Sequence, residues 1–163
     1  MKYLHERKLN LGTKALNLIV LRENNFNVPE FEIISSDEMN DDSLKYNIDN
    51  IVKKLSSDTY AVRSSSNLED GENLSFAGQF NTYLNVHKSD VYDKVIKCID
   101  SLKNDNVKEY LRQSDVAEEV SMGVIIQKML KPQKSGVIFT SNPQGILNEE
   151  VIIVGEGIGE NIV

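Results

Sequence analysis

The sequence contains little cysteine and little histidine, and it has no long apolar run. Cys98 is its single cysteine, so the chain has no intrachain disulfide and no cysteine set for a metal. His5 and His87 lie far apart and outside any cluster of ligand residues, which gives little support to a metal site or to histidine-centred catalysis. A charged N-terminus without a signal core or spanning segment predicts a cytoplasmic protein.

Positive charge is also scarce. The 163 residues include 18 Lys and Arg against 25 Asp and Glu, which gives a formal net charge of -7. This balance argues against a general nucleic-acid or membrane-surface binder, because such proteins need a basic face. An anionic ligand would have to be met by a local cluster of donors. The hydrophobic share of 40% is typical of a globular protein with the length of one domain or a large part of one.

One stretch has the residues for such a cluster. Residues 60–66 read Tyr-Ala-Val-Arg-Ser-Ser-Ser, a β-prone run that brings Arg63 and three serines to the mouth of a glycine-containing loop at 67–79. Arginine offers forked donors and serines offer small hydroxyls, so the pattern suits a phosphate chain. Taken alone, the same residues also fit an ordinary solvated turn.

The hydrophobic periodicity predicts helices separated by short strands. Residues 11–21 form a helix entered through Gly12, where Lys14 and free amides suit an anion, although a surface lysine explains Lys14 equally well. Further helices are expected at 48–55, after Ser89 with Cys98 on its buried face, and at 107–111. Strands are expected at 31–34, 59–63, 80–86, 122–130, 136–140 and 150–154, with 122–130 as an inner strand and 136–140 as its partner. The glycines at 155, 157 and 159 do not have dinucleotide-fingerprint spacing.

Eight blocks taken together resemble the nucleotide-binding region of the phosphoenolpyruvate synthase and pyruvate phosphate dikinase family. The Ser-Phe-Ala-Gly-Gln block is most similar to the phosphoenolpyruvate synthase and rifampicin phosphotransferase branch. The blocks lie at residues 12–18, 28–29, 61–66, 69–70, 75–79, 82–86, 126–129 and 136–143.

This resemblance implies an α+β, ATP-grasp-like domain with a mixed sheet and flanking helices, of which residues 1–163 form the N-terminal part. In that family, ATP gives its β-phosphate to a histidine on a swivelling domain, and the histidine passes it to pyruvate or a rifamycin antibiotic. By resemblance, Lys14 and Arg63 bind the ATP phosphates, Gln127 lies at the adenine side, and the nucleotide pocket includes Gly78, Thr82 and Tyr83. Packing is an alternative role for Thr82 and Tyr83.

The resemblance places the magnesium ligands, the swivelling histidine and the acceptor domain outside this chain, in cis or in trans. We therefore expect no catalytic residue and no metal ligand within residues 1–163. The family's Gly-Gly-Lys-Gly is replaced by Gly12-Thr13-Lys14-Ala15, and its Gln-Asp after Gly78-Gln79 by Phe80-Asn81. These changes keep open an alternative, a non-catalytic nucleotide- or protein-binding remnant with a regulatory role. A third possibility is an α/β domain in which both cations serve stability alone.

An interrupted sheet leaves an unpaired edge. The resemblance has the chain stopping within the nucleotide-binding region, so we expect its sheet to expose hydrogen-bonding groups that a neighbouring strand would normally cover. Such edges promote association between chains. The isolated chain is therefore expected to dimerise or aggregate.

Overall fold

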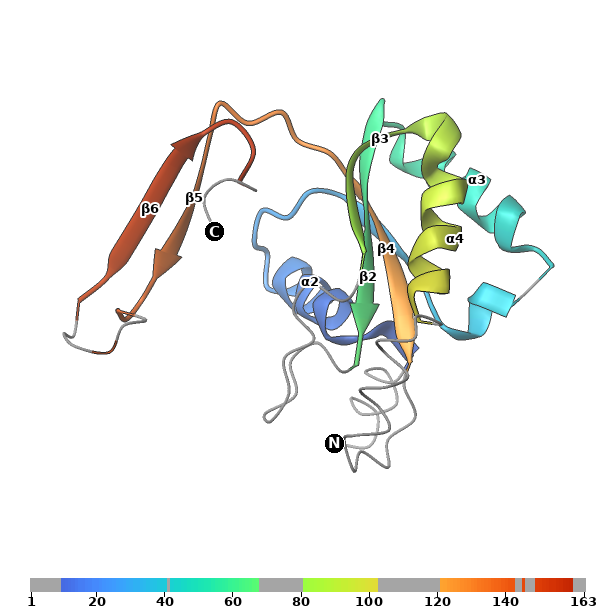
Figure 1. The fold of residues 1–163 in the computed structure, drawn as a ribbon, viewed down its shortest axis with the longest axis horizontal. Helices are drawn as coiled ribbons and strands as arrows, with labels where there is room; N and C mark the ends of the chain where they lie inside the picture. The colour runs from blue at the N-terminus through green and yellow to red at the C-terminus, as the bar shows by residue number, and fades with distance from the viewer. Residues whose placement is uncertain are drawn as a thin grey trace. The chain divides into compact units, whose positions relative to one another are not determined.

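The computed structural model describes residues 10–40, 42–67, 81–102, 121–142, 145 and 149–159. The chain divides into two compact units, Met1–Met129 and Leu130–Val163. The first unit contains α2 (Thr13–Glu23), β1 (Phe31–Ile34), η1 (Asp37–Asn40), α3 (Leu44–Leu55), β2 (Thr59–Ser66), β3 (Thr82–His87), η2 (Lys88–Asp90), α4 (Val91–Ser101) and β4 (Met122–Lys128). The second contains β5 (Lys134–Phe139) and β6 (Val151–Glu156) (Figure 1).

The first unit is built on a four-stranded sheet in the order β1-β4-β2-β3. All strand pairings among the described residues are antiparallel, so the expectation of a mixed sheet is wrong for this part of the chain. β4 lies inside the sheet, as its continuous run of β-branched residues predicted. Its residues from Met122 to Gln127 are all buried, because strands cover both of its edges and helices cover both of its faces.

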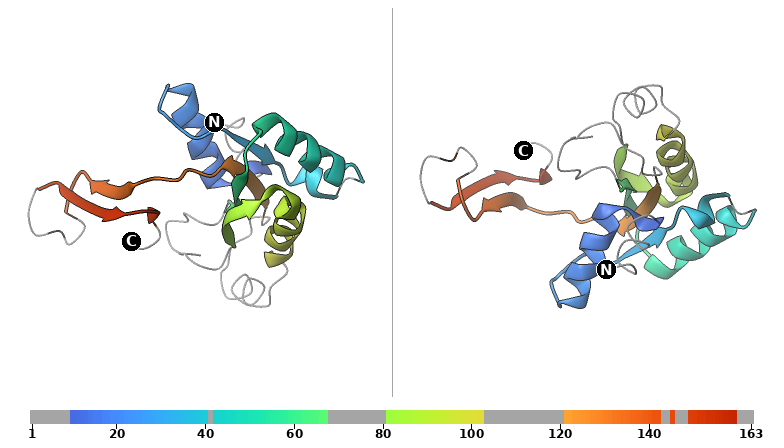
Figure 2. Two further views of the ribbon diagram at one scale, coloured as in Figure 1. Left: turned by 90° about the horizontal axis from the view of Figure 1, so that it is seen from above. Right: turned by 90° about the horizontal axis from the view of Figure 1, so that it is seen from below.

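Two separate cores form on the two faces of this sheet. On one face, α3 and α4 pack against a cluster that includes Tyr60, Val62, Val124 and Ile126. On the other face, Ala15 and Ile19 of α2 pack against Phe31 and Ile125. Figure 1 and Figure 2 show α2 on one side of the strands and the other two helices on the opposite side. The prediction of helices that flank the sheet is confirmed.

The helix predicted at 11–21 is confirmed as α2, which runs from Thr13 to Glu23 and is entered through Gly12 as predicted. Gly12 has a φ of 75°, a left-handed value that glycine adopts without strain, and Asn24 caps the other end. Leu11, Ala15, Leu18 and Ile19 share the buried face, as their spacing indicated. The predicted helix at 48–55 is confirmed and begins earlier, at Leu44.

The strands of the second unit pair differently from the prediction. Residues 136–140 were expected to pair with 122–130, but β5 pairs with β6, and Val137 lies opposite Ile153. The physical reason is that β1 and β2 already occupy both edges of β4. The predicted strand at 150–154 is confirmed as β6.

Other predictions have different outcomes. The helix after Ser89 is confirmed as α4, with a fully buried Cys98. The strand predicted at 80–86 is confirmed as β3, although it begins at Thr82. His87 is exposed, as expected, whereas His5 and the helix expected at 107–111 lie outside the described residues.

Candidate nucleotide-binding site

Arg63, Thr82 and Gln127 share one face of the sheet. Arg63 of β2 lies opposite Thr82 of β3 on one side and opposite Ile125 of β4 on the other, and Gln127 follows two positions further along β4. Side chains alternate along a strand, so residues at even spacing point to the same face. This is the face that α2 covers through Ile125. Three of the predicted site residues are therefore brought together here.

The first turn of α2 meets the same face near Arg63. The backbone N–H of Ala15 donates a buried hydrogen bond of 2.9 Å to Ser65 Oγ, and Ser65 lies two residues beyond Arg63 on β2. Lys14 precedes Ala15 and is half-buried. Along β2, the turn that carries Lys14 lies near Ser65 at one end, and Arg63 lies in the middle. At the other end, Gln127 of β4 lies opposite Ala61. From Ser65 to Ala61 the strand rises by about 13 Å.

Arg63 has positive charge that the described residues leave unpaired. The ion pairs of the described part of the chain join Lys54 to Glu32 and Lys128 to Glu30, at 2.6 and 2.9 Å. Neither of these carboxylates forms an ion pair with Arg63, which is half-buried. A partly desolvated guanidinium without a carboxylate partner is suited to bind an anion bidentately.

The three serines after Arg63 are structural, which corrects their expected role as phosphate donors. β2 continues through Ser66, and all three side chains are fully buried. Ser64 Oγ donates to the backbone oxygen of Asn81 at 2.9 Å, and Ser66 Oγ donates to that of Ser121 at 3.3 Å. Ser65 accepts from Ala15. Each hydroxyl has a hydrogen-bond partner within the protein, as buried polar groups require.

Gln127 is held at the far end of this face. Its side chain is 8% exposed, and Nε2 donates to the backbone oxygen of Pro29 at 3.1 Å. This contact ties the segment before β1 to the sheet. Its role at the adenine side remains a prediction.

Tyr83 lies on the opposite face from Arg63. It pairs with Val62 and packs against the core under α4, where Lys94 Nζ is 4.7 Å from its ring centroid. Desolvation, followed by the neighbouring Cys98, raises the pKa of the Tyr83 hydroxyl. The structure therefore does not bring Tyr83 together with the other predicted site residues. Gly78 lies outside the described residues.

Cys98 is buried in the core under α3 and α4, on the face of the sheet opposite to Arg63. Burial raises the pKa of its thiol from 9.0 to about 12, although a backbone hydrogen bond from Ser64 and the charge of Lys14 act in the opposite direction. Since the thiolate is the nucleophile, a thiol held protonated has no catalytic use at neutral pH.

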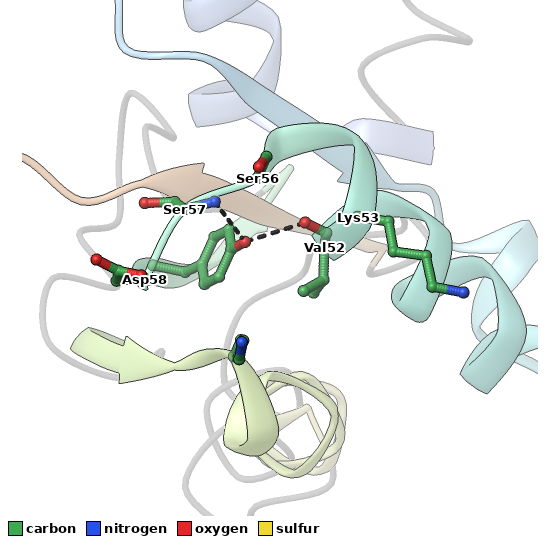
Figure 3. A pocket seen from close by; sticks show the side chains of 7 residues that line it. Val52, Lys53, Ser56, Ser57 and Asp58 are labelled. Carbon is green, nitrogen blue, oxygen red and sulfur yellow. Dashed lines mark hydrogen bonds between the residues drawn. The ribbon is translucent and has the colours of Figure 1, made fainter.

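A separate hollow of about 400 Å³ lies beside the end of α3 (Figure 3). Tyr60 Oη donates to the Val52 oxygen at 3.1 Å and accepts from the Ser57 N–H at 3.0 Å, while Lys53 extends away from Ser57 and Asp58. None of the predicted site residues lines it. Its lining consists of Val52, Lys53, Ser56, Ser57, Asp58, Tyr60 and Lys88.

The described residues hold neither a metal-binding cluster nor a membrane-spanning helix. No cluster of three or more His, Cys, Asp or Glu side chains there is arranged to hold a metal ion. In the same ranges, every helix is too short or too polar to cross a bilayer.

Sequence reasoning missed two contacts that shape the site. Ser65 anchors the start of α2, and the backbone oxygen of Asn81 receives both the N–H and the hydroxyl of Ser64, at 3.1 and 2.9 Å. Both contacts join residues distant in sequence. A signal existed only for the first, because a glycine before a helix indicates a close approach by another part of the backbone.

Comparison with known proteins identifies the family of this chain. The family model described as pyruvate phosphate dikinase, AMP/ATP-binding domain, matches residues 31–163. The chain is 32% identical over 182 residues to an uncharacterized phosphotransferase of Bacillus subtilis. This alignment covers 93% of this chain and 22% of that protein. It is 42% identical over 106 residues to the phosphoenolpyruvate synthase of Pyrococcus furiosus, with 63% and 13% of the two chains covered.

A rifampicin phosphotransferase of Streptomyces sp is 40% identical over 107 residues, which cover 64% of this chain and 12% of that protein. The chain thus spans between 12% and 22% of the length of these curated relatives. The family match itself covers most of the chain and includes Arg63, Thr82 and Gln127. The chain therefore belongs to the pyruvate phosphate dikinase AMP/ATP-binding domain family.

Proposed function

We propose that this chain is the ATP-binding portion of a dikinase-type phosphotransferase. Lys14 and Arg63 neutralise the phosphate chain, and Gln127 lies beside the adenine. The observation that carries the proposal is the common sheet face on which Arg63, Thr82 and Gln127 meet the Lys14 turn of α2. Phosphoryl transfer depends mainly on positioning and charge neutralisation, which two cations on one rigid face can provide.

In the complete cytoplasmic protein, the β-phosphate of ATP passes to a histidine on another domain and then to pyruvate or a similar acceptor. Magnesium would supply further positive charge to the phosphate chain, and the residues that would hold it lie outside this chain. The contribution of residues 1–163 is to bind and orient the nucleotide. Membership of the family, and its phosphotransferase relatives, support this nucleotide-binding role.

The test is the thermal stability of the 163-residue chain with and without Mg-ATP. A ligand that binds only the folded state stabilises it by mass action, by about 2.7 kcal/mol when its concentration is 100 times Kd. The expected result is a raised Tm in the parent, and no rise in Lys14→Ala or Arg63→Ala. Lys53→Ala is the matched control, because Lys53 is an exposed lysine of α3 that lines the separate hollow.

Each alternative gives a different pattern in this test. A folded parent with no Tm rise contradicts nucleotide binding by this chain. A rise that Lys53→Ala abolishes, but Lys14→Ala and Arg63→Ala retain, moves the nucleotide to the hollow at α3. A parent that binds Mg-ATP but transfers no phosphate when supplied with the complementary domains of a relative is the regulatory remnant, and the catalytic part of the proposal then fails.

A further inference from the structure

We propose that Ser65 is a positioning residue for Lys14, and that the neighbouring serines have no part in this task. The inference rests on the proposed function, because it concerns how the same site presents one of its two cations. Ser65 does not touch the nucleotide in this account. It acts by fixing the first turn of α2 against β2.

The contact between Ser65 and α2 is direct and buried. Ser65 Oγ accepts the Ala15 N–H at 2.9 Å, and both residues have 0% exposure. The first N–H groups of a helix have no partner within the helix. Ser65 supplies one of them with an acceptor from the sheet, whereas helix N-caps usually provide it from the adjoining chain. One side chain of β2 therefore joins the first turn of α2 to the strand by a hydrogen bond.

Gly12 shows how closely the two elements approach. A Cβ added at Gly12 would lie 1.9 Å from the backbone oxygen of Ser65 and 2.6 Å from its Oγ. The backbone of Gly12 thus rests on Ser65, and the Ala15 N–H of the same first turn is hydrogen-bonded to Ser65 as well. Lys14 lies between these two contacts, so its Cα is fixed on both sides.

The adjacent serines provide natural controls. Ser64 and Ser66 are as buried as Ser65, but their hydroxyls donate to the backbone of Asn81 and Ser121. Removing the hydroxyl of Ser64 or of Ser65 takes one side-chain hydrogen bond from the same strand, to Asn81 in the first case and to α2 in the second. Only the loss at Ser65 releases the turn that carries Lys14. A structural role and a positioning role can therefore be distinguished.

The experiment measures the Kd of Mg-ATP in a double-mutant cycle of Ser65→Ala and Lys14→Ala. Ser65→Ala is expected to weaken binding by about tenfold in the parent, which corresponds to about 1.4 kcal/mol, and to have little effect once Lys14 is absent. Ser64→Ala, in the same cycle, is expected to show no coupling to Lys14. The amide of Ala15 should lose hydrogen-exchange protection in Ser65→Ala and keep it in Ser64→Ala.

The outcomes separate this inference from the proposed function. If the parent does not bind Mg-ATP, both fail. If the parent binds and Ser65→Ala weakens binding equally with and without Lys14, the role of Ser65 is structural and this inference alone is wrong. The same holds if Ser64→Ala couples to Lys14 as strongly. Should Ser65→Ala not fold, Ser65→Cys keeps a weak acceptor in a slightly larger side chain, and the same dependence on Lys14 is expected with a smaller loss.

Discussion

The two units use similar strands in different surroundings. In β4, Val124, Ile125 and Ile126 are each 0% exposed, whereas in β6, Ile152, Ile153 and Val154 are 62%, 41% and 62% exposed. Both runs consist of β-branched residues. β4 has a strand on each edge and a helical layer on each face, while β6 has β5 as its described neighbour. A continuous apolar run therefore marks a strand suited to burial, and the surrounding layers decide whether burial occurs.

The largest difference between the two units is expected when the same side-chain truncation is made in β4 and in β6. Ile126→Ala removes a fully buried side chain from the core under α3 and α4, and should lower the free energy of unfolding by about 2–5 kcal/mol. Ile152→Ala removes a side chain that is 62% exposed and should change it by less than about 0.5 kcal/mol. Urea denaturation followed by circular dichroism measures both. Equal losses would show that the ribbon of β5 and β6 is packed as tightly as the sheet.

A second comparison uses one glycine from each unit with the same backbone conformation. Gly12 and Gly157 have φ values of 75° and 77°, but an added Cβ meets Ser65 only at Gly12 and finds nothing within 4 Å at Gly157. Alanine at Gly157 should cost about 1–2 kcal/mol from backbone strain. Gly12→Ala should cost about 1–3 kcal/mol more, because the clash adds to this strain. Thermal denaturation of both variants checks the difference, and equal Tm values would contradict a close approach of α2 to β2.

The third prediction concerns the pH dependence that the packed unit confers. The Cys98 thiol has a folded pKa of about 12 against an ordinary value of 9.0, so above pH 9 the unfolded chain loses a proton that the folded chain keeps. The unfolded state then binds fewer protons, and stability falls as pH rises between these values. The fall is at most about 1.4 kcal/mol per pH unit. The difference between the parent and Cys98→Ala, measured by urea denaturation at pH 8, 9 and 10, isolates this effect from other titrating groups. A difference that does not change with pH would contradict the burial of the thiol.

The smallest change in stability is expected where the ribbon faces outward. Ile138, Ile152 and Val154 lie on one face of β5 and β6 and are each more than 60% exposed. Ile152→Lys should alter the free energy of unfolding by less than about 0.5 kcal/mol but reduce self-association of the chain, because charge blunts exposed apolar strands. Sedimentation velocity at several concentrations measures this. Tyr46→Lys on α3, a side chain 68% exposed, is the control, and a parent that stays monomeric would contradict the expectation.

Much of the fold could be predicted from the sequence because its elements are locally encoded. The spacing of Leu11, Ala15, Leu18 and Ile19 defines the buried face of α2, and Gly12 and Asn24 mark its ends. The inner position of β4 also follows from its composition. Its partners do not, since pairing depends on segments far away in the chain, and the hairpin expected between 122–130 and 136–140 does not exist.

The candidate site was predictable in part. Arg63, Thr82 and Gln127 come together on one face because the register of β2, β3 and β4 aligns them. Tyr83 lies on the other face, since it is adjacent to Thr82 and side chains alternate. The burial of the three serines was missed because a hydroxyl at a strand end can bind a ligand or a backbone. The choice depends on the approach of α2, Asn81 and Ser121.

The position of β4 also has a consequence for how the protein folds during synthesis. It is the last of the four strands in the chain, yet it lies between β1 and β2. The hairpin of β2 and β3 can close early, which places Arg63 opposite Thr82. β1 gains its neighbour only after residue 128 has left the ribosome, and such long-range pairing is slow. The end of the proposed site that holds Gln127 is therefore the last to form.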